Sequence, residues 1–288
     1  MSENVVTSLV ERLDIEQLDR DLFRGFSPKD GRRRVFGGQV AAQALVAAVR
    51  TIDGERRVHS LHSYFLRPGD PKTPIIYEVD RIRDGRSFTT RRVVAIQNGD
   101  AIYNMSASFQ KSEEGLSHQY PMPEAAPPES VPSTEALIEK AASETQNSVF
   151  EFLLKLERPI WLHDLDPINP LAPRKRTGTH LVWFRTKHPL PDDPLLHQCV
   201  LTFASDYTLL DASLSQHGKT WFDPKLIVAS LDHAIWFHRP FRADEWLLYA
   251  TESPSTSNAR GMNFGRIYTR DGVLAASVAQ ENLMRLVD

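Results

Sequence analysis

Residues 61–79 read LHSYFLRPGDPKTPIIYEV and residues 233–251 read HAIWFHRPFRADEWLLYAT, and these two stretches decide the fold because they share one pattern. In each, an apolar run rich in aromatic residues precedes an Arg-Pro pair, and a second apolar run follows it. Arg67-Pro68 of the first stretch therefore corresponds to Arg239-Pro240 of the second. A pattern that recurs in the same order along a chain predicts an internal duplication.

The agreement continues beyond the Arg-Pro pairs. Tyr77 and Tyr249 stand at the same offset from them, and Asn98-Gly99 and Asp271-Gly272 then fall at equivalent places. Both dipeptides favour a hairpin turn, which needs a residue with positive φ. Two copies of a unit this long predict two duplicated domains rather than a solenoid of short repeats.

A proline-rich segment separates the two copies. The chain has 288 residues, of which 41% are hydrophobic and 25% charged, a balance typical of globular proteins long enough for two domains. Residues 111–135, KSEEGLSHQYPMPEAAPPESVPSTE, have no apolar period, which predicts an exposed linker. We therefore expect an N-terminal domain over 1–110, a linker over 111–135 and a C-terminal domain over 136–288.

Each copy has the same expected order of elements, a helix followed by strands. The helices are predicted over residues 36–52, which are rich in alanine, and 197–217, which carry an apolar stripe at helical spacing. An apolar helix followed by an antiparallel meander predicts an α+β fold with two tandem antiparallel sheets, each wrapped around a central helix. The strands expected in the second copy span 226–238, 245–252, 260–270 and 273–286.

Composition excludes several function classes. The formal net charge is -3 with no strongly basic domain, so we expect no nucleic-acid partner. The single cysteine, Cys199, cannot form an internal disulfide or a cysteine-rich zinc site, and we expect no metal. The sequence has no run apolar enough for a signal peptide or a membrane span, so we expect a cytoplasmic protein without membrane insertion. It also lacks the G-x-S-x-G, H-E-x-x-H and phosphate-loop motifs.

Four polar side chains stand at the edges of apolar faces. Asp206 and Asp211 flank the stripe of the second helix, and a carboxylate there costs free energy unless it is paired; periodicity does not choose between the two. Gln280 shares a strand face with apolar residues, where it either bonds a backbone group or serves a site. Ser230 lies in a strand just before the second repeat stretch, and strand serines are usually structural.

Three further features could bind a substrate. Gly37 and Gly38 form a glycine-rich helix entry, whose N–H groups either hold an anion or carbonyl oxygen or simply allow close helix packing. His59 alternates with apolar residues on a strand, as either a core histidine or a site residue. Arg260, like other strand arginines here, is either a solvated side chain or a receiver of phosphate groups.

Six segments in order, VFGGQVAAQAL, VHSLHSYFLRPGD, IIYEVDRIRDGRSF, FASDYTLL, LDHAIWFHRPFRADEWLLY and SNARG, resemble the acyl-CoA thioesterase II family. The resemblance covers almost the whole chain apart from the linker. It implies a double-hotdog fold, an acyl-CoA substrate, no cofactor and assembly into a homo-oligomer, as a dimer or tetramer. The acyl chain length remains open.

The family's catalytic set is an Asp on the second helix, a Thr or Ser on the next strand and a Gln on the last strand. Carried across by motif, these are Asp206, Ser230 and Gln280, with serine keeping the hydroxyl of the threonine it replaces. The resemblance thus implies hydrolysis of the thioester by a water that the carboxylate activates. The first helix lacks a carboxylate, so we expect one active centre per chain.

Two other functions suit the same fold. One is an enoyl-CoA hydratase or dehydratase, because Asp166–Leu171 superficially resembles the hydratase motif; Ala172, however, stands where that motif has histidine. The other is a non-catalytic acyl-CoA-binding protein, which the presence of all three polar residues disfavours.

Overall fold

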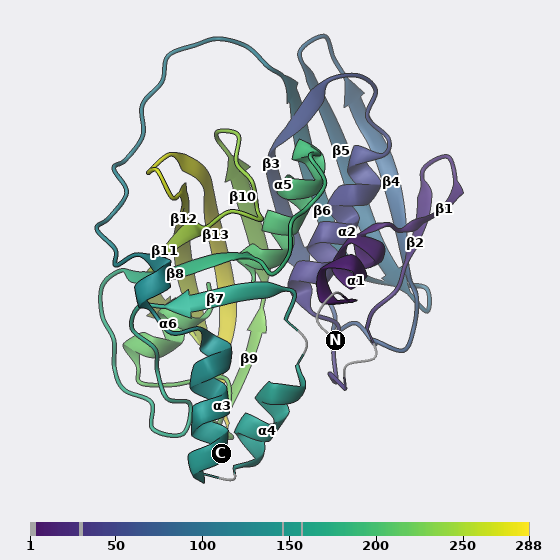
Figure 1. Ribbon diagram of the computed structural model, residues 1–288. Helices are drawn as coiled ribbons and strands as arrows, with labels where there is room; N and C mark the ends of the chain where they lie inside the picture. Colours follow the sequence, from purple (N-terminus) through teal and green to yellow (C-terminus); the bar gives the residue numbers. More distant parts are fainter. Residues whose placement is uncertain (1–3, 29–30, 146, 157, 288) are drawn as a thin grey trace.

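The computed structural model describes residues 4–28, 31–145, 147–156 and 158–287. Two halves lie side by side, each with a helix against the inner face of a curved antiparallel sheet (Figure 1). The elements of the N-terminal half are, in chain order, α1 (Asn4–Leu13), β1 (Glu16–Asp19), β2 (Leu22–Gly25), α2 (Gly37–Val49), β3 (Arg56–Phe65), β4 (Ile75–Asp84), β5 (Phe88–Gln97) and β6 (Asp100–Lys111).

The second half contains the equivalent elements and a helical hairpin that precedes them. Its elements are η1 (Pro128–Ser130), α3 (Thr134–Thr145), α4 (Ser148–Lys155), β7 (Ile160–Asp164), β8 (His180–Thr186), α5 (Pro194–Ser205), α6 (Asp211–Gln216), β9 (Leu226–Ser230), β10 (Asp232–Phe237), β11 (Leu247–Ser257), β12 (Arg260–Thr269) and β13 (Leu274–Leu286). The double-hotdog prediction is confirmed, since a helix lies within the sheet of each half.

The two predicted sheets are joined edge to edge. The strand order is β1-β2-β4-β5-β6-β3-β10-β13-β12-β11-β8-β7, with β9 paired to β13, so the thirteen strands form one sheet. The junction is the antiparallel pair β3 and β10, in which Tyr64 lies opposite Asp232 and Ser60 opposite Trp236. Backbone hydrogen bonds therefore connect the halves directly.

The central helices of the two halves pack against each other, with the start of α2 at the end of α5. Helix α2 is lined by buried alanines, which let it lie close to β2, β4, β5 and β6. At its start, a Cβ on Gly38 would lie 2.4 Å from the carbonyl oxygen of Phe203 in α5. Only glycine permits this approach. The packing interpretation of Gly38 is therefore correct, and it brings the start of α2 to the end of α5.

The second central helix is shorter than predicted. The continuous helix expected over 197–217 is wrong, because α5 ends at Ser205, Asp206 caps it with φ -86° and ψ -2°, and α6 begins at Asp211. Leu209, in the intervening turn, and Leu214, in α6, are both buried. The apolar spacing continues through the break because both helices bury residues under the same sheet, so periodicity could not reveal it.

The strand predicted over 226–238 is also two strands. Leu231 separates β9 from β10, and both pair with β13. Residues 276–279 of β13 pair with β10, whereas residues 282–286 pair with β9. Gln280 therefore lies between the part of β13 that pairs with β10 and the part that pairs with β9.

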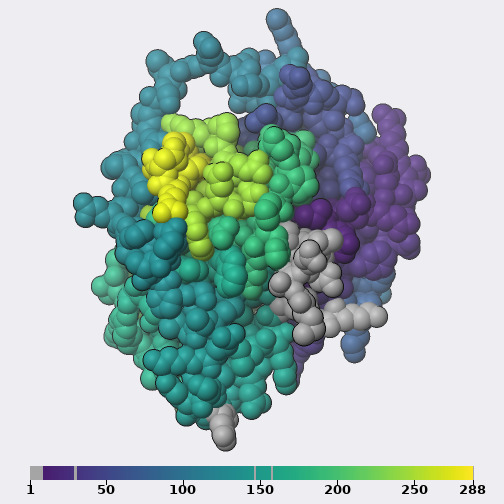
Figure 2. Space-filling model, in the orientation of Figure 1, coloured from purple at the N-terminus to yellow at the C-terminus, as the bar shows by residue number. Residues whose placement is uncertain are grey.

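The segment between β6 and η1 has no helix or strand and runs over the outside of the molecule (Figures 1 and 2). It is nevertheless attached to the second half. Gln119 Nε2 donates to Gly272 O at 2.8 Å, and its Oε1 accepts from Leu274 N at 3.0 Å. Trp183 Nε1 donates to Ala126 O at 2.8 Å. The segment thus covers part of the outer face of the second half.

The two tyrosines at equivalent positions of the repeat make equivalent hydrogen bonds to the central helices. Tyr77 OH donates to Gln43 Oε1 of α2 at 2.7 Å, and Tyr249 OH donates to Ser205 O of α5 at 3.1 Å. Both side chains are fully buried. Each tyrosine therefore ties the central helix of its half to the surrounding sheet.

We predict that Tyr77→Phe lowers the free energy of unfolding by about 1–2 kcal/mol, because Gln43 Oε1 would stay buried without its donor. Urea denaturation measures the change. Tyr120→Phe is the matched control, since Tyr120 is 70% exposed and its variant should unfold like the wild type. Equal stability of all three proteins would contradict the prediction.

Candidate active site

Three polar side chains from distant parts of the second half meet at one carboxylate. Gln280 Nε2 donates to Asp206 Oδ1 at 2.7 Å, and Ser230 Oγ donates to the same oxygen at 3.3 Å. Asp206 caps α5, Ser230 ends β9 and Gln280 lies in β13. The break after α5 and the division between β9 and β10 are what bring them together.

The start of α2 faces the same carboxylate. The backbone N–H of Gly38 donates a hydrogen bond to Asp206, and a Cβ on Gly37 would lie only 2.7 Å from Asp206 Oδ2. The N-terminal end of a helix carries partial positive charge and N–H groups without intrahelical acceptors. The glycine pair therefore presents donors to the site as well as allowing the helices to approach.

Asp206 is a buried carboxyl group whose charged form is only partly stabilised by hydrogen bonds. It is 8% exposed, and burial raises its pKa to about 6, against the opposing effect of the hydrogen bonds from Gln280, Gly38 and Ser230. A carboxyl group with a pKa near neutrality is ionised at pH 7 yet remains basic enough to accept a proton. The electrostatics thus suit a general base.

Aromatic residues of both halves surround this carboxylate. Phe65 and Tyr103, on β3 and β6, have ring centroids 5.1 Å apart, and the Phe65 ring also lies against Gly37. Burial, with a further contribution from the charge of Asp206, raises the pKa of Tyr103. Phe36 packs against Tyr207 at 4.7 Å on another side. Sequence reasoning missed Phe65 and Tyr103, although their alternation along β3 and β6 indicated inward positions.

Asp211, the other acidic candidate, faces a different space. Its Oδ1 accepts from Trp221 Nε1 at 2.6 Å, and burial raises its pKa to about 6. It lines a cavity of about 400 Å³ together with Arg176 and His180, under α3 and α4. Residues 167–170, from the hydratase-like segment, line the same cavity. The structure thus separates Asp211 and that segment from the cluster around Asp206.

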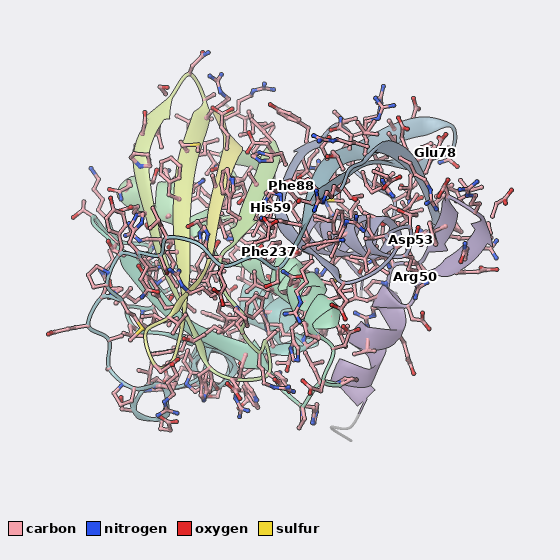
Figure 3. All side chains as sticks on the ribbon, turned by 90° about the horizontal axis from the view of Figure 1, so that it is seen from above. Arg50, Asp53, His59, Glu78, Phe88 and Phe237 are labelled. Atoms are coloured by element: carbon pink, nitrogen blue, oxygen red, sulfur yellow. The ribbon has the colours of Figure 1, made fainter. Side chains whose placement is uncertain are left out.

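The structure does not bring His59 to this cluster. His59 Nε2 lies 2.8 Å from Ser108 Oγ, and its ring contacts Phe88 edge to face at 5.7 Å. Figure 3 shows it beside Phe88 and near Phe237, where the two halves meet. Arg260 lies on the opposite face of the sheet from Gln280, with Nε 2.7 Å from Glu281 Oε1.

The described residues contain no group of three histidine, cysteine or acidic side chains arranged to hold a metal ion. Among the same residues, no helix is both long and apolar enough to cross a membrane. The cluster itself contains a carboxylate, an amide, a hydroxyl and a backbone N–H group.

The fold and this cluster define a hotdog-type thioesterase, and comparisons with known proteins agree. The acyl-CoA thioesterase family model matches residues 164–283, and the acyl-CoA thioesterase N-terminal domain matches residues 27–110. The chain is 40% identical to human acyl-coenzyme A thioesterase 8, over 95% of its own length and 88% of that protein's. It is 38% identical to Haemophilus influenzae acyl-CoA thioesterase 2, over 98% of both.

A solved structure gives the same result. The crystal structure of the acyl-CoA thioesterase II TesB2 from Mycobacterium marinum superposes with a TM-score of 0.79 at 43% identity, over 98% of both chains. The chain therefore belongs to the acyl-CoA thioesterase II family.

The raised pKa of Asp206 predicts a pH-dependent stability. Because its pKa rises from 3.8 to about 6 on folding, its contribution is most favourable below about pH 4 and is lost as the pH rises through about 6. Asp206→Asn has no such titration. Relative to this variant, we expect the wild type to lose about 1–1.5 kcal/mol of unfolding free energy between pH 5 and pH 8. Urea denaturation of both proteins at the two pH values measures it, and a pH-independent difference would contradict it.

Proposed function

We propose that this protein hydrolyses acyl-CoA to a free fatty acid and coenzyme A, with Asp206 as the general base. The single observation that carries the proposal is the buried carboxylate of Asp206, with its raised pKa, held at one oxygen by Gln280 and Ser230. Such a group can take a proton from a water molecule next to a bound thioester, an effect worth typically 10²- to 10⁴-fold in rate.

In the proposed reaction, the water oxygen adds to the thioester carbonyl carbon while one of its protons passes to Asp206. The tetrahedral intermediate then expels the sulfur of coenzyme A, and the proton returns to that thiolate. Gln280 Oε1 is buried and accepts no hydrogen bond within the described part of the chain, which supports a role in accepting the second hydrogen of the water. Ser230 and Gln280 would thus fix the direction of attack.

The start of α2 is the proposed site for the developing oxyanion. The first N–H groups of a helix have no intrahelical acceptors. The Gly38 N–H donates to Asp206, and Gly37 lies against the same carboxylate, so the Gly37 N–H is the proposed donor to the oxyanion. Donors placed where negative charge develops commonly contribute the largest single effect on rate. On this proposal the N-terminal half supplies the electrophilic side of the centre and the C-terminal half the base.

Hydrolysis is favoured over the two alternative functions. Ala172 stands where the hydratase motif has histidine, and the segment before it lines the cavity of Asp211 instead of the cluster. A protein that only binds acyl-CoA gains nothing from a buried carboxylate, because burying the charge costs free energy. The site chemistry therefore supports a hydrolase.

Two further residues are proposed to contact the substrate outside the cluster around Asp206. Arg260 keeps 40% of its side chain exposed while paired with Glu281, and we propose that it meets phosphate groups of coenzyme A. His59, between the two halves, is proposed to contact the substrate from the N-terminal half. We also propose that the chain is divided into an N-terminal domain over 1–110, a linker over 111–135 and a C-terminal domain over 136–288.

We further propose a homo-oligomer, a dimer or tetramer, that works in the cytoplasm. The outer face of the sheet exposes Tyr64 and Trp236 on the adjacent strands β3 and β10, at 60% and 36%, and Phe264 on β12, two strands beyond β10, at 43%. Exposed aromatic residues on adjacent strands are typical of protein interfaces. The single buried cysteine, Cys199, suits a reducing compartment.

We predict that Asp206→Asn lowers kcat/KM for acyl-CoA hydrolysis by about 10²- to 10⁴-fold, because the amide cannot accept the proton of the water. Release of free thiol from coenzyme A measures the rate, and circular dichroism checks the fold. Asp211→Asn is the matched control, since this carboxyl group also has a raised pKa but faces the other cavity. An Asp206→Asn variant as active as Asp211→Asn would remove Asp206 as the base.

We also predict that the rate of the wild type depends on one ionisation near pH 6. Only the deprotonated Asp206 accepts a proton, and its pKa is about 6, so kcat/KM should fall tenfold per pH unit below that value and level off above it. A profile from pH 4.5 to 8.5 measures this dependence. A rate that stays flat down to pH 4.5 would contradict the assignment.

A further inference from the structure

A second polar cluster lies beside Gln280 and Ser230 on the same face of the sheet. It consists of Asn263 on β12, Asn282 on β13 and Ser213 on α6, and all three side chains are 0% exposed. Fully buried amides are costly in an apolar core unless they are hydrogen-bonded. None of the three touches Asp206, and the proposed reaction does not use them.

The register of the strands connects this cluster to the site. Asn263 lies opposite Gln280 in the β12–β13 pair, and Asn282 lies opposite Ser230 in the β13–β9 pair. Each uncharged residue of the proposed active centre therefore has an asparagine as its cross-strand neighbour. Cross-strand neighbours are close enough to fix one another's position.

Hydrogen bonds then link the two asparagines to each other and to α6. Asn263 Nδ2 donates to Asn282 Oδ1 at 2.6 Å and to the backbone oxygen of Gln280 at 3.2 Å. Ser213 Oγ lies 3.1 Å from both Asn282 Oδ1 and Leu210 O and shares its proton between them. One connected network therefore reaches β12, β13 and the helix that follows the Asp206 turn.

The network stands at the point where β13 changes its partner strand on one side. On this side, β13 pairs with β10 before Gln280 and with β9 after it. Between the two pairings, two hydrogen bonds replace the ladder: Leu231 N donates to Glu281 O at 2.9 Å, and Glu281 N donates to Asp232 Oδ1 at 2.7 Å. These two bonds hold Glu281. The bond from Asn263 to the Gln280 oxygen adds a restraint on Gln280 itself.

We propose that Asn263, Asn282 and Ser213 are positioning residues that hold Gln280 and Ser230 in register with Asp206. The inference rests on the proposed function, because it assigns the three residues to the same active centre. Buried, connected hydrogen-bond networks specify one arrangement of the groups they join, which an apolar core of equal volume would not do. The three residues act through Gln280 and Ser230 and do not contact the substrate.

The test compares Asn263→Leu and Ser213→Ala with Ser215→Ala. Ser215 is the matched control, since it lies on the same helix, is 3% exposed, and its hydroxyl donates to Ala212 O at 3.2 Å, away from the asparagines. We expect kcat to fall about tenfold for Asn263→Leu and about threefold for Ser213→Ala, with KM little changed, because misplaced catalytic groups slow the chemical step. Ser215→Ala should match the wild type.

A pH profile separates positioning from a general loss of structure. The hydrogen bond from Gln280 lowers the pKa of Asp206, so displacing Gln280 should raise that pKa and move the acid limb of the profile to higher pH in Asn263→Leu. Unchanged kcat and an unmoved acid limb in both variants would overturn the proposal. If Asn263→Leu fails to fold, Ser213→Ala decides by the same two measurements.

A substrate-free measurement keeps this inference distinct from the proposed function. The carboxyl carbon of Asp206 can be titrated by ¹³C NMR and assigned by its absence in Asp206→Asn. A raised pKa in Asn263→Leu but not in Ser215→Ala supports the network even if the wild type hydrolyses no acyl-CoA. An identical pKa in all three proteins overturns it even if the wild type is active.

Discussion

The contact between the start of α2 and the end of α5 is the constraint on which the rest of the structure depends. The Phe203 carbonyl oxygen lies where a Cβ of Gly38 would be, so the two helix ends touch without side chains between them. This approach buries Asp206, which raises its pKa, and also brings an N–H donor to its carboxylate. Burial raises the pKa of Asp206, and the hydrogen bonds to its carboxylate lower it again in part. Together they give the carboxyl group an intermediate pKa that neither effect would give alone.

The two copies of the repeat have diverged around this contact. In the first, the central helix has small side chains and its start carries a backbone N–H that donates to Asp206. In the second, the helix ends early and the residue that caps it is Asp206. Tyr77 and Tyr249 keep their equivalent roles in holding the helices, although one bonds a side chain and the other a backbone oxygen. The duplication therefore preserved the scaffold, whereas the residues at the contact between the helices differ between the two copies.

Much of this architecture could be predicted from the sequence, because the Arg-Pro pairs and their offsets recur. Choosing Asp206 over Asp211 could not, since both flank one apolar stripe and only the resemblance pointed to the first. The early end of α5 could not be predicted because Leu209 in the turn and Leu214 in α6 are both buried and continue the apolar spacing of α5. Asn263 was also beyond prediction, because its importance depends on strand register, which a single sequence specifies only after the bulges and partner changes are known.

The continuous sheet has a consequence for how substrate enters and product leaves. Because β3 and β10 share a backbone ladder, swinging the halves apart would break several hydrogen bonds at once. A hinge motion that separates the two halves at the β3–β10 pair would therefore cost too much free energy to accompany each turnover. Passage must rely on smaller movements of side chains and surface loops, so turnover would be gated locally while the framework stays rigid.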